Sequence, residues 1–214
     1  MSSEPIYDAP SPMPTAVISV NRLEAFSDGV FAIAITLLVL ELRPPTTLPL
    51  GPQLRAMVPQ IGAYAAAFLV VGMAWIGHHG LFHLLRRMNK TLIWLNMGLL
   101  LCISFVPFPT MVLGLDPLDP VAIRLFALTM ILAGWFYNAM WAYASRGHRL
   151  IKQDLSPTLI RLTWIRSLAF PAAYLLAFAA TFWRPALGLV ILALVPTGFM
   201  LPSRFDAREY RARS

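Results

Sequence analysis

The stretch "NRLEAFSDGVFAIAITLLVLEL", residues 21–42, decides the class of fold. Its second half is an unbroken apolar run, which is typical of a helix that crosses a membrane. Its first half carries polar and charged side chains, namely Arg22, Glu24, Ser27 and Asp28. Asn21 and Glu24 together resemble a capping box, which predicts a helix start at about Arg22. An ionised carboxylate inside a membrane costs about 2.5 kcal/mol or more, so Asp28 needs a partner or a proton.

The rest of the chain is also strongly apolar. Of its 214 residues, 58% are hydrophobic and 13% are charged, which excludes a soluble domain whose surface needs charge. Charge-free segments long enough for a hydrocarbon core of about 30 Å predict six spans, at about 23–42, 57–80, 91–113, 121–144, 163–182 and 185–202. We therefore expect an all-α polytopic membrane protein. Its six-helix domain covers residues 21–203, between a disordered tail (1–20) and a basic tail (204–214).

The positive charges prefer one side of the predicted membrane. Grouping the 17 Lys and Arg residues by predicted loop puts 13 on one side and four on the other. Positive residues concentrate in cytoplasmic loops, so both termini are expected in the cytoplasm. The net charge of +7 then reflects topology and attraction to anionic lipid, and we expect no nucleic-acid partner. The four residues on the outer side are Arg43, Arg55, Arg124 and Arg184.

The sequence lacks the residue patterns that are typical of several classes of function. The single cysteine, Cys102, excludes a disulfide or a CxxC metal site within one chain. No catalytic triad, P-loop or paired carboxylates occur within a span, so we expect neither an enzyme nor a bound cofactor. The opening motif is not repeated in the second half, where the only echo is "RFD" at 204–206. A central pathway would therefore require several copies of the chain around a symmetry axis.

The first predicted helix has two faces. Successive residues of a helix are about 100° apart around its axis. One stripe of side chains therefore lies within about 60° of the direction of Ile33. Ser27 and Asp28 lie away from this stripe, on opposite sides of it. The stripe consists of Arg22, Phe26, Gly29, Ile33, Thr36, Leu37 and Leu40. An apolar stripe on a membrane helix usually touches lipid, and the residues alone do not decide whether this one does.

Polar side chains on two later spans lie at the depth of Asp28. Trp75, His78 and His79 follow one another at i, i+3 and i+4 near the cytoplasmic end of the second span, and Asn96 has a comparable depth in the third. We expect these side chains to form a polar network with the start of the first helix, although polar residues near a helix end are often merely interfacial. The first helix contributes Arg22, Phe26, Ser27 and Asp28.

Read as Arg-x-x-x-Phe-Ser-Asp, residues 22–28 resemble the signature of the transmembrane protein 175 family of potassium channels. Trp75 with His78 and His79, and "NMGLLLCISFVPFPT" at 96–110, resemble the family's other characteristic stretches. The resemblance covers all six spans, and it is strong up to about residue 110. Bacterial members carry one six-helix repeat and form homotetramers, whereas animal lysosomal members carry two repeats and dimerise. The chain resembles the bacterial form, which implies a homotetramer in the bacterial inner membrane.

The resemblance also implies roles for the stripe. In the family the first helix lines the pore, and its narrowest point is a ring of large aliphatic side chains that corresponds here to Ile33. Further rings correspond to Leu37 and Leu40, and a threonine tied to ion preference corresponds to Thr36. Glu41 lies near the outer mouth, where it could concentrate cations. The implied function is a passive potassium leak with a hydrophobic gate and weak selectivity, while the polar network holds the first helix at a fixed angle.

Two other functions fit parts of the sequence. His79 and His83 have the i, i+4 spacing of two ligands on one helix face, which suits a membrane haem or metal protein, but no cysteine or acidic cluster joins them. Asp28 and Glu41 suit a small ion or proton-coupled transporter in which carboxylates carry the ion. Flux separates these classes, because a channel is passive whereas a coupled carrier saturates and depends on a second ion.

Overall fold

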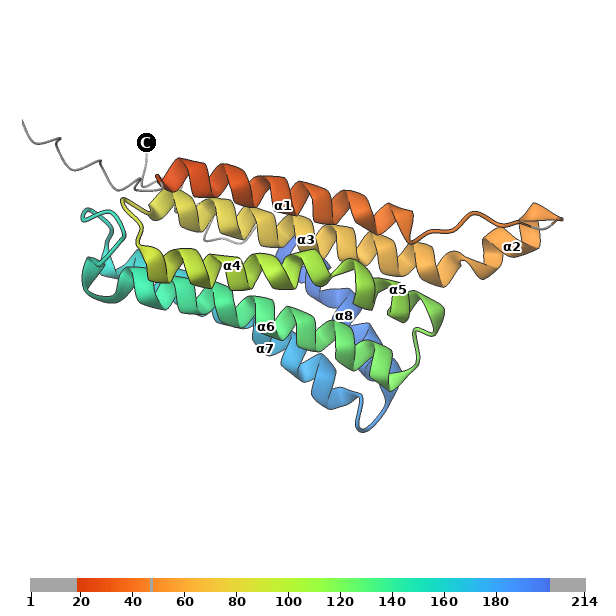
Figure 1. Ribbon diagram of the computed structural model, residues 1–214. Coiled ribbons are helices and arrows are strands. Elements are labelled where there is room, and N and C mark those ends of the chain that lie inside the picture. The colour runs from red at the N-terminus through yellow and green to blue at the C-terminus, as the bar shows by residue number, and fades with distance from the viewer. Residues whose placement is uncertain (1–18, 47, 201–214) are drawn as a thin grey trace, which may run out of the picture.

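The computed structural model describes residues 19–46 and 48–200, whose regular structure is helical except for one isolated bridge between Leu85 and Ile151 (Figure 1). The expected all-α class is confirmed. The predicted tails fall outside the described residues, apart from positions 19 and 20. In chain order the helices are α1 (Val20–Leu40), α2 (Leu50–Ala56), α3 (Val58–Leu84), α4 (Lys90–Phe105), α5 (Pro107–Leu115), α6 (Pro120–Ser145), the 3₁₀ helix η1 (Arg146–His148), α7 (Pro157–Ala180) and α8 (Pro185–Met200).

Five segments of the described chain are long and apolar enough to cross a membrane. They are Val20–Leu40, Val58–Leu84, Lys90–Leu115, Pro120–His148 and Pro157–Ala180. The sixth predicted span corresponds to α8, whose apolar part within the described residues, Pro185–Pro196, is shorter than the roughly 20 residues that a full span requires. The prediction of six spans is therefore confirmed for five of them.

The third predicted span is not one continuous helix. It breaks at Val106, where α4 ends and α5 begins with Pro107. Proline has no N–H to donate to the preceding turn, so Pro107 and Pro109 favour a new helix start over continuation. Thr110 strengthens the junction, because its hydroxyl donates to the carbonyl of Val106 at 2.8 Å.

Two predicted helix starts are wrong, because each helix begins at a capping serine further upstream. In α1 the cap is Ser19, whose hydroxyl accepts from the N–H of Arg22 at 3.4 Å, so the proposed box of Asn21 and Glu24 does not form. In α7 the cap is Ser156, which accepts from the N–H of Leu159 at 3.2 Å and moves the start from 163 to Pro157. The longer α7 also includes Arg161, which the predicted span left in a loop.

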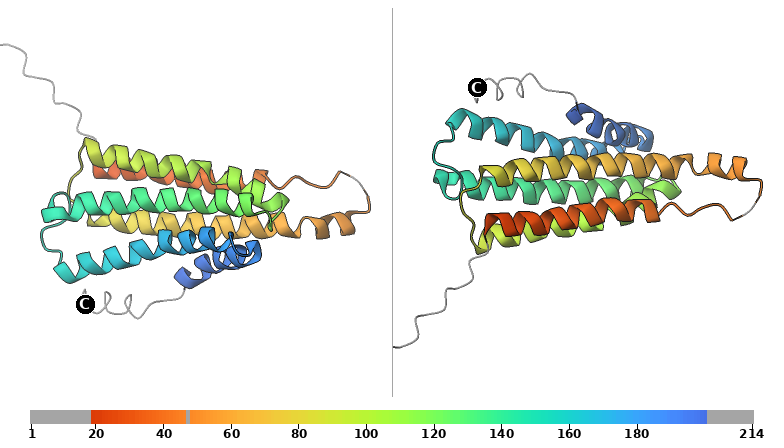
Figure 2. Two further views of the ribbon diagram at one scale, coloured as in Figure 1. Left: turned by 90° about the horizontal axis from the view of Figure 1, so that it is seen from below. Right: turned by 90° about the horizontal axis from the view of Figure 1, so that it is seen from above.

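The helices lie side by side, with α1 at one edge of the bundle and α7 and α8 at the other (Figure 2). The central helix α6 contacts α4, α5, α7 and α8, whereas α1 contacts only α3, α4 and α5 among the main packing pairs. Two glycines permit close packing on α6. A Cβ on Gly98 would lie 2.2 Å from the ring of Phe136, and one on Gly134 would lie 2.8 Å from Pro171.

One end of the bundle holds most of the described positive residues. We call it the basic end, and it comprises the start of α1 with the connections 85–89 and 146–156 (Figure 1). These connections bind each other, since the N–H of Arg86 donates to Leu150 at 2.8 Å and the N–H of Lys152 donates to Leu84 at 3.1 Å. Arg43, Arg55, Arg124 and Arg184 belong to the opposite end. The fold thus separates the two charge groups as the loop assignment predicted.

Candidate functional site

One face of α1 attaches the helix to the bundle. Its buried side chains are spaced by three or four residues, as one face of a helix requires. Four of the five are apolar and pack against α3, α4 and α5, while Ser27 is polar and fully buried. The five are Leu23, Ser27, Phe31, Ala34 and Leu38.

The opposite face of α1 has no partner within the described chain. Ile33 is 60% exposed and Leu40 is 70% exposed, and Leu37 is also exposed. This is the stripe that the helical periodicity predicted. Thr36 lies on it, and its hydroxyl donates to the carbonyl of Ile33 at 2.9 Å. Because the hydroxyl hydrogen is used inside the helix, the lone pairs of the oxygen face outward as acceptors.

A buried chain of three side chains joins α1, α4 and α3. The amide Nδ2 of Asn96 donates to the hydroxyl of Ser27 at 2.9 Å, and this hydroxyl donates to the carbonyl of Leu23 at 2.8 Å. On the other side, Nε2 of His78 lies 2.9 Å from Oδ1 of Asn96. All three side chains are 0% exposed. Such partners offset the cost of burying polar groups, about 1–3 kcal/mol for each group left unpaired.

The geometry assigns the protons of this chain. Oδ1 of Asn96 can only accept, so the proton between it and His78 belongs to Nε2 of the histidine. Nδ1 of His78 is buried and has no partner in the described part of the chain, and the ring is stacked on Phe82 with centroids 4.2 Å apart. A second proton on Nδ1 would have no acceptor there, so the site fits a neutral ring.

Two further bridges connect α1 and α3 at the rim of this chain. The indole Nε1 of Trp75 donates to Oδ1 of Asp28 at 2.8 Å. One turn nearer the basic end, Nδ1 of His79 lies 2.9 Å from Oε1 of Glu24, which is an ion pair when the histidine is protonated. The rings of Trp75 and His79 are stacked 6.1 Å apart. The rim bridges are half-exposed, unlike the buried chain.

The predicted network is therefore present with a changed membership. Ser27, Asp28 and the four predicted partners on α3 and α4 all take part, in one chain of three side chains and two separate pairs. Arg22 and Phe26 are exposed, and neither side chain forms a hydrogen bond or ion pair with a described residue. Glu24 is a member that the sequence reasoning assigned to a cap. The spacing of the residues could have indicated this pairing. Glu24 and Asp28 are four residues apart, as are Trp75 and His79, so two parallel bridges can form between the helices.

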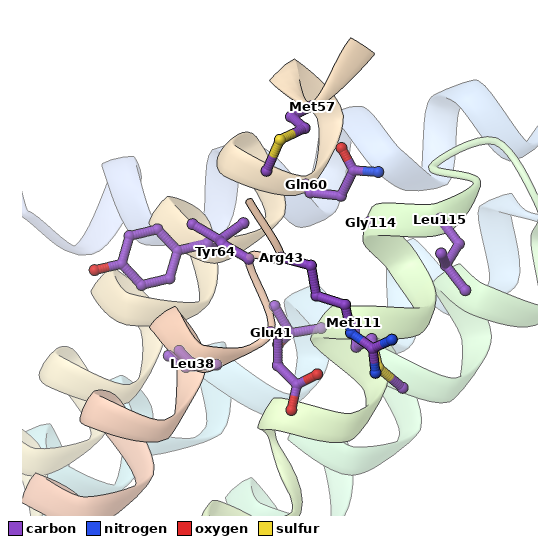
Figure 3. Close-up of a pocket in the computed structure, with 11 residues that line it drawn as sticks. Leu38, Glu41, Arg43, Met57, Gln60, Tyr64, Met111, Gly114 and Leu115 are labelled. Carbon is purple, nitrogen blue, oxygen red and sulfur yellow. The ribbon is translucent and has the colours of Figure 1, made fainter. Parts of the chain in front are cut away.

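Glu41 lies at the other end of α1, in a cavity of about 410 Å³ (Figure 3). Figure 3 shows that the lining comes from the end of α1 and from α3 and α5, and that Arg43 shares the cavity. Gln60 and Tyr64 of α3 add polar groups. Glu41 is thus half-buried within the fold of the chain and off the exposed stripe, and its role at an outer mouth stays a prediction.

The histidines considered for a metal or haem do not gather with other ligands in the described structure. His79 binds Glu24, and His83 is exposed one turn further along α3. Within residues 19–46 and 48–200, no group of three or more His, Cys, Asp or Glu side chains is arranged to hold a metal ion.

These features define a class: a polytopic helical membrane protein whose first helix is attached along one face and open along the other. Residues 22–107 match the family model described as the endosomal/lysosomal potassium channel TMEM175. A potassium channel of Streptomyces collinus is 36% identical over 171 residues, which cover 75% of this chain and 83% of that protein. The chain therefore belongs to the TMEM175 family, a family of ion channels and not of enzymes.

Two further relatives place the chain within this family. The crystal structure of a lysosomal potassium-selective channel TMEM175 homologue from Chamaesiphon minutus superposes with a TM-score of 0.77 at 30% identity, covering 85% of this chain and 96% of that one. The rat endosomal/lysosomal proton channel TMEM175 is 30% identical over 211 residues, which cover 87% of this chain but 42% of the rat protein. The fold is thus that of solved family members.

Proposed function

We propose that the chain is one subunit of a homotetrameric, potassium-permeable cation channel that mediates a passive leak across the bacterial inner membrane. The observation that carries the proposal is the contrast between the faces of α1. One face is anchored by packing and a buried polar chain, whereas the other presents Ile33, Thr36 and Leu37 without a partner among the described residues. Copies of this face around an axis would line a pore.

The gate in this proposal is a ring of Ile33 side chains, followed by rings of Leu37 and Leu40. Aliphatic rings close a narrow pore by excluding water and open when the helices separate enough to wet it. The exposure of these side chains in the single chain supports this role, because they are free to meet their counterparts in other subunits. No carbonyl-lined filter is needed for such a gate.

Ion preference in this proposal comes from Thr36. Its outward lone pairs can replace part of the water shell of a potassium ion, since the hydroxyl hydrogen is bound to Ile33. Hydroxyls alone impose little geometric constraint, so selectivity over sodium should be weak. Glu41 would add negative potential near the outer end and attract cations.

The orientation follows from the basic end, which the proposal places in the cytoplasm with both chain termini. Cytoplasmic segments are enriched in Lys and Arg, and the described residues concentrate theirs at this end. The basic side chains would contact anionic headgroups of the inner leaflet. The permeant potassium ion is the only ligand that the proposal requires.

Reconstitution tests the proposed function. Liposomes containing the purified full chain are loaded with potassium chloride and diluted into sodium chloride with a protonophore and a pH-sensitive dye. Potassium efflux would draw protons inward and quench the dye. Vesicles loaded with sodium chloride and diluted into potassium chloride would give weaker quenching. Absence of flux for both ions would contradict the proposal, and equal flux would contradict the preference for potassium.

A small ion or proton-coupled transporter is the second candidate, and the rat relative, which is named a proton channel, supports proton permeation but not coupling. The same vesicles without the protonophore distinguish the two functions. Dye quenching that needs no protonophore indicates proton permeation through the protein itself. Potassium flux that saturates and depends on a proton gradient indicates a carrier, whereas flux that is linear in the gradient indicates a channel.

A further inference from the structure

A second cavity lies beside α3, and His79, which contacts Glu24 of α1, is among its lining residues. It is a groove of about 640 Å³ between α3 and α7, with α6 as its floor. The groove forms because α7 packs on α6 and α8 while α3 packs on α1, α5 and α8, which leaves little direct contact between α3 and α7 (Figure 2). Tyr137 of α6 closes the floor, donating its hydroxyl hydrogen to the carbonyl of Gly77 at 3.0 Å.

The lining changes from polar to apolar along the groove. Toward the basic end it includes the cationic Arg166, the last-turn histidine His83 and the hydroxyl of Thr163. Further along it is lined by apolar side chains such as Ile76 and Phe170. None of the described residues that line the groove is acidic, so an anion bound there would meet no like charge on its walls.

We propose that this groove binds an anionic phospholipid from the leaflet at the basic end. The phosphate would lie against Arg166, because a guanidinium offers several N–H groups in the planar arrangement that phosphate oxygens accept. The nearby hydroxyls of Thr163 and Ser167 donate within the protein, to Leu159 and Asn138, so the headgroup contact depends on Arg166. One acyl chain would follow the apolar walls toward the bilayer centre. Basic pockets between membrane helices are recognised sites for such headgroups.

A second copy of the chain fits this groove less well. A helix from another subunit would bring no phosphate to Arg166 and would leave the hydroxyl-lined part hydrated. A lipid supplies the negative charge and the apolar chain in one molecule, and it is present in the surrounding solvent at high concentration. The site is independent of permeation, so its test uses lipid retention and not flux.

Native mass spectrometry of the full chain in detergent measures the binding. Dioleoyl phosphatidylglycerol is titrated against the wild type, Arg166→Gln and the matched control Arg161→Gln, which removes an exposed cation on the same helix outside the groove. We expect Arg166→Gln to weaken lipid binding by about fivefold and Arg161→Gln by less than about twofold. Equal losses in both variants would indicate diffuse surface attraction and would overturn the proposal. Equal binding of dioleoyl phosphatidylcholine would also overturn it.

A second pair of variants fills the groove without changing charge. Gly80 lines the groove and has open space where a side chain would start, so Gly80→Leu obstructs the acyl chain and also favours the helix. Gly62→Leu is the control, at an open and exposed position of α3 outside the groove. Loss of phosphatidylglycerol binding in Gly80→Leu alone, with unchanged oligomer mass, supports the lipid site. A changed oligomer mass with unchanged lipid binding would show a contact between copies and overturn it.

Discussion

The two faces of α1 differ in what their side chains contact. On the attached face, apolar side chains are buried and Ser27 is hydrogen bonded within the chain. On the open face, Ile33, Leu37 and Leu40 are exposed, and residues 19–46 and 48–200 provide nothing for them to pack against. The attached face is therefore explained by the fold of the described chain, whereas the open face has no such explanation within the described residues. Substitutions on the two faces should accordingly change different measurements.

The largest effect is expected from Asn96→Leu on the attached side. The substitution keeps the volume but leaves Nε2–H of His78 and the hydroxyl of Ser27 each without one partner. At about 1–3 kcal/mol for each buried group, the thermal midpoint in detergent should fall on the order of 10 °C. Ser104→Ala on the same helix removes an exposed hydroxyl that bonds only its own backbone, and it should shift the midpoint by about 2 °C at most. Similar shifts in both variants would show that the buried chain does not hold α1.

The second effect concerns the open face. Under the proposed function, Ile33→Asn should hydrate the constriction and raise potassium flux in liposomes on the order of tenfold, which corresponds to about 1.4 kcal/mol. Its thermal midpoint should change far less than that of Asn96→Leu, because Ile33 makes few contacts within the subunit. Val39→Asn is the control, since Val39 is exposed on α1 but lies off the stripe. Unchanged flux in Ile33→Asn would remove Ile33 as the gate.

A smaller effect is expected from Trp75→Phe, which keeps a ring but removes the donor to Asp28. The bridge is half-exposed, so its loss should cost about 1 kcal/mol and lower the midpoint by about 3 °C. Trp135→Phe provides the control, because the indole N–H of Trp135 has no hydrogen-bond partner within the described residues. Adding Asp28→Ala, which removes the acceptor, to each background completes a double-mutant cycle. A coupling energy near zero would mean that the carboxylate does not depend on Trp75.

The smallest effect is expected from His79→Gln. The side chain of His79 is 60% exposed, and exposed ion pairs contribute about 0.5 kcal/mol or less. The midpoint should shift by about 2 °C at most. A larger shift than that of Trp75→Phe would reverse the ranking of the two rim bridges and make the pair with Glu24 the main attachment at the rim.

The sequence predicted the faces of α1 well and the pairing of its polar groups only in part. Periodicity alone is enough to separate Ser27 and Asp28 from the stripe, because both faces belong to one helix. Which partner each side chain meets depends on how α3 and α4 are rotated about their own axes. The two residues point to different neighbours, Ser27 to Asn96 on α4 and Asp28 to Trp75 on α3. That rotation is set by packing along whole helices, so a local motif cannot predict it.

The helix boundaries that were wrong had local signals of their own. Ser156 followed by Pro157 is a helix start, and the prolines at 107 and 109 are a helix break. The search for charge-free segments overrode these signals, since it placed the start of α7 beyond Arg161. In a membrane protein a helix extends into the headgroup region, so the limits of a charge-free run underestimate the helix.

The double bridge at the rim has a mechanical consequence. The bonds of Asp28 and Glu24 to α3 are four residues apart, about 6 Å along the helix axis. A single bond would leave a pivot, but two bonds on one face resist tilting of α1 against α3, and Asn96 ties α4 to the same unit. Any opening motion would then carry α1, α3 and α4 together as one rigid block. Its hinge would be sought where this block meets α6, at Gly98 and Gly77, and not at the constriction itself.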